Sequence, residues 1–294
     1  MPLIKHLVIS GGGPTMIQSL GSIQHLEENK FIDINIIESI YGTSAGAIIG
    51  VLICLKYDWQ TLYDYIIKRP WQDVFNVNIQ NIFDAYTKKG IFDEKVIIKC
   101  FKPLFDAKNI SMNITLKEFF EYSKIELHMF SFEVNNFEIE NISYLTHPDL
   151  TLIKAIQMTC ALPVLMTPIL IENKCYIDGG ITSNYPLKYC IEEKKNIEEI
   201  LGFKNQYTDY SKNQIDANST LLDFIISFLF KLIHSIGTSN TNQTTINYEV
   251  ICNTNLLSIN SLKTALSSID VRKELYSSGI EFAKEFLSKL ENAI

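Results

Sequence analysis

A serine lies between two glycines in the run Gly42-Thr43-Ser44-Ala45-Gly46, after an apolar stretch at residues 34–40 and before small apolar residues at 45–55. Such a serine can occupy a sharp turn between a strand and a helix, because the flanking glycines allow tight folding and leave space for a substrate. The following helix would point its free N–H groups and the positive end of its dipole at the reacting atoms. We therefore predict that Ser44 is a nucleophile, supported by Gly42 and Gly46.

Two other glycine-containing motifs follow predicted strands: Gly11-Gly12-Gly13 and Asp178-Gly179-Gly180. Segments that leave the carboxyl ends of strands in an open parallel sheet meet in one crevice. A serine hydroxyl needs a neighbouring base to accept its proton, and we predict that Asp178 is this base, held on its turn by Gly179 and Gly180. The N–H groups of Gly11, Gly12 and Gly13, with that of Ala45, are the predicted donors to the oxyanion.

The identity of the base has an alternative, since His128, His147 and His234 could complete a triad. His234 follows Asp178 in the chain order of α/β-hydrolase triads. However, it lies inside an apolar helical run, where a packing histidine is more usual, and a nucleophile near residue 44 comes early for that fold. The Ser44–Asp178 dyad is therefore preferred. An ordinary aspartate, with a pKa of about 3.9, is a feeble base at neutral pH, so we expect Asp178 in a partly desolvated pocket that raises its pKa.

Nucleotide, nucleic-acid and metal sites are disfavoured. Met16 occupies the third glycine position of a dinucleotide-binding G-x-G-x-x-G, and the glycine run lacks the Gly-Lys-Ser/Thr ending of a P-loop. A net charge of −7 over 294 residues argues against a nucleic-acid partner. The six cysteines have no zinc-ligand spacing and are expected to be reduced thiols, so we expect no metal and no cofactor.

The order of predicted elements favours an α/β fold. A strand at 3–10, a helix with apolar residues at 17, 20, 23 and 26, a strand at 34–40 and a helix at 44–57 alternate as in a parallel sheet covered on both faces. Residues 58–125 are more polar and largely helical. Further along the chain the pattern predicts a strand at 126–134, a helix at 149–161 capped by Asp149, a hairpin over 169–177, strands at 197–203 and 248–252, and helical structure at 262–290.

The composition changes near residue 205, which predicts a catalytic domain at 1–204 and a C-terminal cap and helical segment at 205–294, packed on the same domain. The apolar run from Leu221 to Ile236 is interpreted either as a core helix or as a lid or docking helix at a lipid surface. At sixteen residues, interrupted by charges, it is too short to predict a transmembrane helix. With no signal-peptide pattern, we expect an intracellular, cytoplasmic protein whose peripheral membrane contact is made by this run.

The motifs occur in the order found in patatin-like phospholipases, together with Cys160-Ala161-Leu162-Pro163 and with Asn184-Tyr185-Pro186 six residues past the aspartate. Over residues 4–190 the chain resembles that family. The resemblance implies a three-layer α/β/α lipid acyl hydrolase with a central mostly parallel sheet and a Ser–Asp dyad, without histidine and without catalytic calcium. Where the family's glycine loop continues with a basic residue and a glycine, this chain has Thr15 and Met16, which weakens the expected oxyanion stabilisation or changes the head-group preference.

These observations lead us to expect A-type phospholipase activity on a phospholipid or another acyl lipid, through an acyl-enzyme on Ser44 that is hydrolysed by water activated by Asp178. Two alternatives remain at this stage. One is a catalytically weak lipid-binding or interaction module that keeps the fold, and the other is acyl transfer to an alcohol instead of water.

Overall fold

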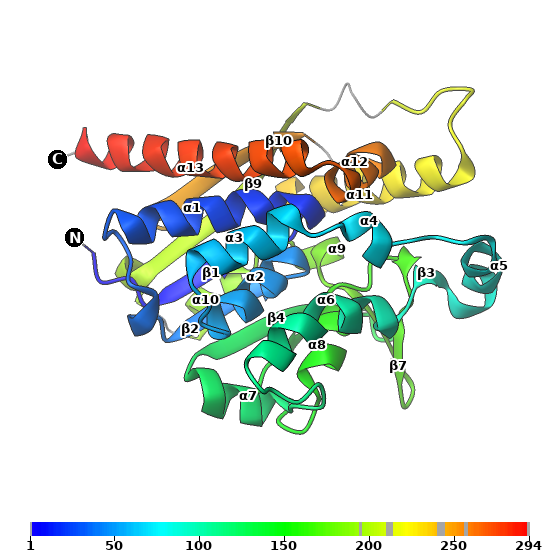
Figure 1. Cartoon of the computed structure of the whole chain (residues 1–294), viewed down its shortest axis with the longest axis horizontal. Coiled ribbons are helices and arrows are strands. Elements are labelled where there is room, and N and C mark those ends of the chain that lie inside the picture. Colours follow the sequence, from blue (N-terminus) through cyan, green and yellow to red (C-terminus); the bar gives the residue numbers. More distant parts are fainter. Residues whose placement is uncertain (1, 194–195, 210–213, 240–244, 256–257, 293–294) are drawn as a thin grey trace.

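The computed structural model describes residues 2–193, 196–209, 214–239, 245–255 and 258–292, except for the side chains of 208, 209, 234 and 237–239. Its centre is a mixed sheet covered by helices on both faces (Figure 1). Five neighbouring strands run parallel, in the spatial order β10 (Tyr248–Asn255), β9 (Ile200–Asp209), β1 (His6–Ile9), β2 (Ser39–Thr43) and β4 (Glu126–Glu133). The predicted fold class is therefore confirmed.

Antiparallel strands extend the sheet beyond β4. They are β5 (Glu138–Ile142), β8 (Lys174–Asp178) and β7 (Ile169–Ile171). A separate two-stranded sheet joins β3 (Gly90–Phe92) to β6 (Val164–Met166). Among the described residues the helices are, in chain order, α1 (Met16–Glu28), α2 (Ala45–Cys54), α3 (Trp59–Lys68), α4 (Trp71–Val74), α5 (Ile79–Lys88), α6 (Glu94–Ala107), α7 (Leu116–Ser123), α8 (Leu152–Thr159), α9 (Gly180–Ser183), α10 (Leu187–Glu192), α11 (Leu221–Ser239), α12 (Ile259–Ser267) and α13 (Ile269–Glu291).

Alternate residues of the central strands face two apolar cores, as the period of two of a strand requires. Leu7 and Ile40 belong to the larger core, which includes most of α2, whereas Val8 and Tyr41 belong to a smaller core with α10 on the opposite face. Because both faces are covered, the strands read as continuous apolar runs in the sequence.

Some predicted boundaries were wrong. The apolar run at 34–40 forms a short 3-10 turn, Ile34–Ile36, because the Asp33 side chain accepts the Asn35 N–H, and the strand begins only at Ser39. The helix predicted at 149–161 begins at Leu152, since the Thr151 hydroxyl, and not Asp149, caps it by accepting the Lys154 N–H. In both places a local side-chain bond to the backbone sets the boundary.

The C-terminal segment contributes strands and helices to the same body. The expected boundary at residue 204 falls inside β9, and β10 forms the edge of the central sheet. Helix α13 lies along α1 (Figure 1) in a close crossing, where a Cβ on Gly21 would come within 2.3 Å of the Tyr276 carbonyl oxygen, and one on Gly279 within 2.0 Å of that of Gln18. Small residues at such a crossing let two helix backbones approach closely.

Arg272 fixes α13 to the helical layer. Its side chain is 2% exposed, and its guanidinium donates to four carbonyl oxygens, those of Ile67, Arg69, Ala265 and Leu266, at 2.8–3.1 Å. These carbonyl groups lie at the C-terminal ends of helices, where no N–H of the same helix can donate to them. Arg272 therefore links the ends of α3 and α12 to α13.

Within the described part of the chain, no helix combines the length and the apolar character needed to cross a bilayer.

Candidate active site

Ser44 occupies a strained turn between β2 and α2. Its φ of 52° and ψ of −120° lie in a region that costs a non-glycine residue about 1–3 kcal/mol. The Thr159 hydroxyl accepts the Ser44 N–H at 2.9 Å and donates to the Phe130 carbonyl at 2.6 Å. Because Thr159 is fully buried, this bridge holds the turn in a fixed position.

The two glycines that flank Ser44 are required by close packing of the backbone. A Cβ on Gly42 would lie 2.6 Å from the Ala47 nitrogen, and one on Gly46 would lie 2.2 Å from the Ile9 carbonyl oxygen. No side chain fits at either position without moving the helix away from the sheet. The spacing seen in the sequence therefore corresponds to a physical constraint on the turn.

Asp178 reaches Ser44 along one edge of β4. On β4, β2 pairs with Glu126–Phe130, β5 with Met129–Glu133 and β8 with Ser131–Glu133. Strand β5 pairs with β4 residues that also pair with β2 and with others that also pair with β8, so β5 occupies one edge of β4 by itself. Because a strand has only two edges, β2 and β8 must share the other edge. They approach from opposite directions and end at consecutive β4 residues, with Thr43 opposite Phe130 and Asp178 opposite Ser131.

This arrangement corrects the expected route to the site. We expected Asp178, at the end of a hairpin, to meet Ser44 in the crevice that forms at the carboxyl ends of parallel strands. Strand β8 is instead antiparallel to β4. If β8 lay alongside β2, its carboxyl end would therefore lie at the opposite end of the strands from Ser44. The two strand ends meet because β8, running in the opposite direction along the same edge of β4, ends where β2 stops.

The Asp178 carboxyl group is buried and hydrogen-bonded. The residue is 5% exposed, its Oδ1 accepts the Gly180 N–H at 2.7 Å, and the Ser44 hydroxyl donates a hydrogen bond to it. Burial raises the pKa of Asp178 to about 6, and the hydrogen bonds from Ser44 and Gly180 offset part of that rise. The predicted partly desolvated environment is therefore present. Gly179 packs against the Phe130 carbonyl oxygen, which a Cβ there would approach to 2.3 Å.

Cys160 is a second buried group beside the pair. Its thiol interacts with the Ser44 hydroxyl, and burial, together with the negative charge of Asp178, raises its pKa well above the ordinary value. The thiol therefore stays protonated at neutral pH and adds no competing charge to the site. All six cysteines are described, and they form no disulfide.

The glycine loop lies against Ser44, with its members in different states. A Cβ on Gly11 would lie 3.3 Å from the Ser44 Cβ, but the Gly11 N–H donates to the Asn184 carbonyl at 2.9 Å. Gly11 therefore anchors the loop, and its N–H is not available to an oxyanion as we had expected. For the N–H groups of Gly12, Gly13 and Ala45, no hydrogen bond to a described residue is found. These three N–H groups remain the predicted donors to the oxyanion.

Thr15 and Asn205, the second of which the sequence did not indicate, hold the glycine loop by hydrogen bonds. Asn205, within β9, donates through Nδ2 to the Gly11 carbonyl and to the Thr15 hydroxyl, both at 2.8 Å. Thr15 in turn donates to the Gly12 carbonyl at 3.1 Å. The residue that departs from the family pattern thus braces the loop by hydrogen bonds. The only signal for Asn205 in the sequence was its place just past a predicted strand. For Thr159, which bonds to the Ser44 N–H, the only signal was its place before the Cys160 motif.

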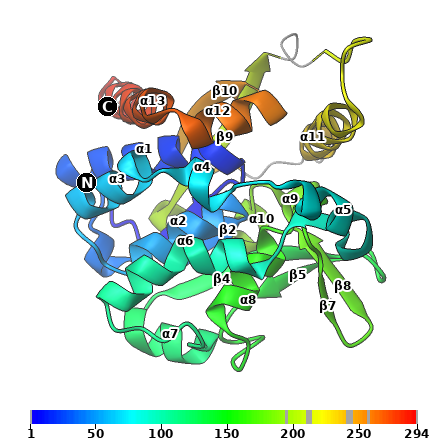
Figure 2. The ribbon, with the colours of Figure 1, turned by 45° about the vertical axis from the view of Figure 1, so that its right-hand side comes forward.

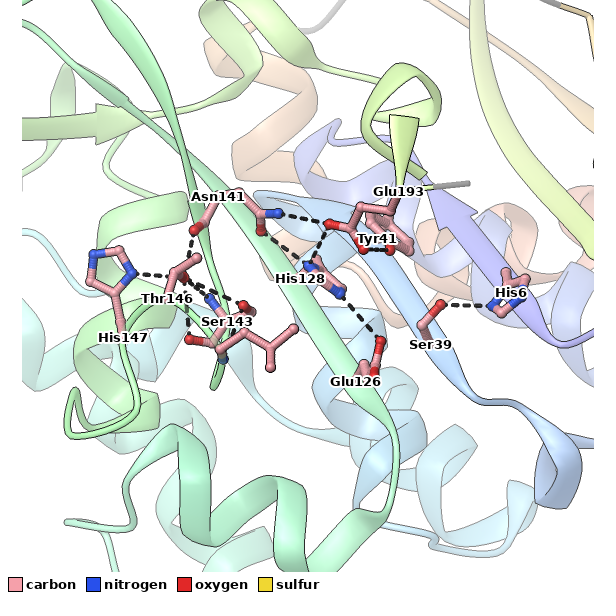
Figure 3. Close-up of polar contacts among 11 residues, drawn as sticks. His6, Ser39, Tyr41, Glu126, His128, Asn141, Ser143, Thr146, His147 and Glu193 are labelled. Atoms are coloured by element: carbon pink, nitrogen blue, oxygen red, sulfur yellow. Dashed lines mark hydrogen bonds and ion pairs between the residues drawn. The ribbon is translucent and has the colours of Figure 1, made fainter. Parts of the chain in front are cut away.

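The described histidine side chains belong to other networks. The rings of His128 and Tyr41 stack with their centroids 4.2 Å apart. The His128 Nδ1 lies 3.2 Å from the Asn141 Oδ1 and 3.6 Å from a carboxylate oxygen of Glu193, contacts that are drawn in Figure 3. The pKa of the Tyr41 phenol is raised by burial and by its bond to Glu193. His128 therefore serves the smaller core.

His147 bonds to a neighbouring hydroxyl: its Nδ1 lies 2.9 Å from the Thr146 Oγ1 (Figure 3). Among the described contacts, neither His128 nor His147 touches Ser44 or Asp178. The side chain of His234 lies outside the described residues. In the described part of the chain, no three His, Cys, Asp or Glu side chains gather as metal ligands would.

Comparison with known proteins identifies similar chains. The sequence model of the patatin-like phospholipases matches residues 7–191, which include Ser44 and Asp178. The chain is 27% identical over 216 residues to "Probable lipid hydrolase 463L" of Invertebrate iridescent virus 6, covering 71% of this chain and 72% of that protein. It is 25% identical over 295 residues to "Uncharacterized protein R571" of Acanthamoeba polyphaga mimivirus, covering 98% and 95% of the two chains.

Two solved structures share the fold. VipD from Legionella pneumophila aligns with a TM-score of 0.54 at 18% identity, over 97% of this chain and 67% of VipD. The type III effector ExoU of Pseudomonas aeruginosa aligns with a TM-score of 0.51 at 13% identity, over 98% of this chain and 53% of ExoU, so this chain spans about half of that protein. At these identities the likeness concerns the fold alone.

Proposed function

Because the chain belongs to the patatin-like phospholipase family, we propose that it is an A-type lipid acyl hydrolase with Ser44 as nucleophile and Asp178 as general base. One observation carries the proposal: the Ser44 hydroxyl, on its strained turn, donates a hydrogen bond to a buried carboxylate whose pKa is raised to about 6. The name of the iridescent-virus relative, a probable lipid hydrolase, agrees with this role.

The proposed reaction proceeds in two steps. The Ser44 Oγ attacks the carbonyl carbon of the acyl ester while its proton passes to Asp178, and the carbonyl oxygen becomes an oxyanion. The tetrahedral intermediate collapses, the alcohol portion of the lipid leaves with the proton from Asp178, and the acyl group stays on Ser44. Asp178 then takes a proton from water, whose oxygen attacks the acyl ester and releases the fatty acid, and the proton returns to Ser44.

The oxyanion would be held by the N–H groups of Gly12, Gly13 and Ala45. Ala45 is the first residue of α2, so its N–H has no acceptor within the helix and lies at the positive end of the helix dipole. Each donor of this kind contributes about 3–4 kcal/mol to lowering the barrier. Fixed peptide groups supply this stabilisation without the basic residue that the family usually has in the glycine loop.

Helix α11 lies beside this site with apolar side chains on two faces. Ile226 and Phe230 pack against Leu162 and Leu165, which follow the Cys160 segment, whereas the outward residues Leu221, Phe224 and Phe228 are 75%, 52% and 57% exposed. A helix that only filled a core would not need the outward stripe. We therefore favour the lid or docking interpretation, in which α11 contacts the lipid surface.

The proposal is tested by labelling and by product identification. A fluorophosphonate probe should label the wild-type protein and the surface control Ser111→Ala, but not Ser44→Ala, because the probe reacts with an activated serine. Mixed phospholipid vesicles should yield fatty acid and lysophospholipid in equal amounts. No labelling and no fatty acid would favour the binding module, and acyl esters formed with an added alcohol would favour acyl transfer.

The pH dependence should report the state of Asp178. Since only the ionised carboxylate accepts the Ser44 proton, kcat/KM for a non-ionisable ester should rise with pH and level off above about pH 7. With a pKa raised to about 6, the acidic limb should be centred near that pH and fall about tenfold per pH unit below it. A limb centred near pH 4, the ordinary value for aspartate, would contradict the assigned base.

A further inference from the structure

Helix α5 exposes an apolar face to solvent at one end of the molecule. Ile79, Ile82, Phe83 and Tyr86 are 73%, 59%, 69% and 93% exposed, and none of the ten residues of α5 is buried. The spacing of these four residues places them on one side of the helix. We call this set, Ile79, Ile82, Phe83 and Tyr86, the α5 face.

A helix of this kind lacks the interactions that usually stabilise a short helix. Isolated helices of fewer than about 12–15 residues are marginal in water, and most helical stability in proteins comes from packing an apolar face. In α5 the capping box of Asn78 with Asn81, and the Lys88–Asp84 pair at 2.9 Å, contribute at the ends and on the polar side. The apolar side is thus the part of α5 that still requires a partner.

The position of α5 connects it to the active site. Strand β3 follows α5 directly and pairs with β6, and the Thr167 N–H donates to the Phe92 carbonyl at 2.8 Å. Strand β6 begins just after Ala161, whose carbonyl accepts the Asp178 N–H at 3.0 Å. The elements around α5 therefore reach the segment that contacts the proposed base.

The same segment separates α5 from α11. Leu162 and Leu165 pack against α11, while β6 pairs with β3 and so with the α5 side. In Figures 1 and 2, α5 and α11 lie on the same side of the molecule, and the β7–β8 hairpin, where Leu170 is 62% exposed, lies below them. Exposed apolar side chains thus flank residues 161–166 from more than one element.

Charge and side-chain type fit a lipid surface. Lys88 and Lys89, both exposed, end the α5 helix, and Lys174 lies at the β7–β8 turn; Lys88 also pairs with Asp84 at 2.9 Å and Lys174 with Glu140 at 3.5 Å. Cations at the border of an apolar face suit a helix that lies in a membrane interface beside anionic head groups. Tyr86, the most exposed residue of the set, combines an apolar ring with a polar tip suited to that boundary.

We propose that the α5 face inserts into the surface of the bilayer that holds the substrate, and that α5 and α11 together seat residues 161–166 on the membrane. This inference rests on the proposed function, since an enzyme whose substrate lies in a bilayer needs a lipid-facing surface beside its site. A protein partner would not require the apolar surface to lie beside the active site.

Vesicle binding tests the proposal with paired substitutions. The double variant Ile82→Ser with Phe83→Ser should bind vesicles of phosphatidylcholine and phosphatidylglycerol at least about tenfold more weakly than the chain without these two substitutions. Binding is measured by sedimentation, with Ser44→Ala present in both proteins to prevent hydrolysis. Wild-type binding should persist in high salt, because apolar insertion is not screened. The matched control Leu3→Ser changes a residue 54% exposed near the N-terminus, at the other end of the molecule (Figure 1), and should bind normally.

A water-soluble, monomeric ester separates this inference from the proposed function. The double variant, made with Ser44 intact, should hydrolyse such an ester at the wild-type rate. If the variant binds vesicles as the wild type does, the inference is wrong while the function stands. Vesicle binding by a wild type that never hydrolyses the ester would remove the function instead.

A reporter variant covers the case in which the double variant fails to fold. Phe83→Trp should show a blue shift of the new fluorescence with vesicles and quenching by brominated lipid. An unshifted, unquenched signal overturns the proposal. The proposal is also overturned if the wild type is a dimer and the double variant is a monomer that still binds vesicles. The α5 face would then be the contact with a second copy of the chain.

Discussion

Replacing Ser44 with alanine should lower kcat on a phospholipid by about 10⁴-fold or more, with little change in KM. Without the hydroxyl no acyl-enzyme can form, and the residual rate comes from the oxyanion donors and from substrate binding alone. The fold should be unaffected, because the Ser44 N–H bond to Thr159 involves the backbone and alanine tolerates this φ no worse than serine does. Steady-state kinetics on phospholipid vesicles measures the effect.

A second substitution at this position serves as its control. Ser44→Gly should be equally inactive but more stable than Ser44→Ala, because glycine adopts a φ of 52° without strain. Both variants should still bind vesicles. Retention of a tenth or more of the wild-type turnover in Ser44→Ala would mean that another residue is the nucleophile.

Replacing Asp178 with asparagine should lower kcat by about 10³–10⁴-fold while making the protein more stable at neutral pH. An amide of the same shape can still accept the Gly180 N–H bond, but it cannot take a proton from Ser44. The gain in stability follows from burial. A carboxylate 5% exposed, with its pKa raised to about 6, costs the folded protein roughly 3 kcal/mol at pH 7.

The sign of the stability change can be checked against pH. The folded-state pKa lies above the unfolded-state value of about 4, so the folded protein binds the proton more tightly. The wild type therefore loses stability from this group as pH rises from about 4 to about 6, whereas Asp178→Asn does not. Urea unfolding should show equal stability of the two proteins near pH 4 and the largest difference above pH 7.

The exposed residue Asp149 provides a matched control, since Asp149→Asn makes the same chemical change on the surface and should leave activity unchanged. If Asp178→Asn is instead less stable than the wild type at neutral pH, the hydrogen bonds to the carboxylate outweigh its burial, and the base would be weaker than we propose.

The sequence predicted the turn at Ser44 from residues close together in the chain. The glycines two positions from Ser44 indicated a sharp turn, and the structure has that turn with φ at 52° and no room for a side chain at Gly42 or Gly46. A turn of this kind depends on a few adjacent residues, so its signal is contained in five positions. The alternation of apolar runs likewise predicted the parallel part of the sheet.

Other parts depended on contacts between distant residues. The register that places Asp178 beside Ser131 is set by pairing of β8 with β4, and no local pattern specifies such a register. Asn205 and Thr159 act through bonds to backbone groups far away in the chain, and their residue types are common in loops and caps. The exposure of the α5 face was likewise invisible, since the spacing of its residues is also that of a buried helix.

Because β2 and β8 pair with the same edge of β4, that strand alone sets the distance between the two parts of the proposed site. Thr43, which precedes the proposed nucleophile, and Asp178, the proposed base, pair with adjacent residues of β4. The chain between them can therefore gain or lose whole loops and helices without changing their separation. Relatives could therefore diverge widely in size between these motifs and keep the same chemistry, whereas a single-residue insertion within β4 would shift one partner against the other and disable both.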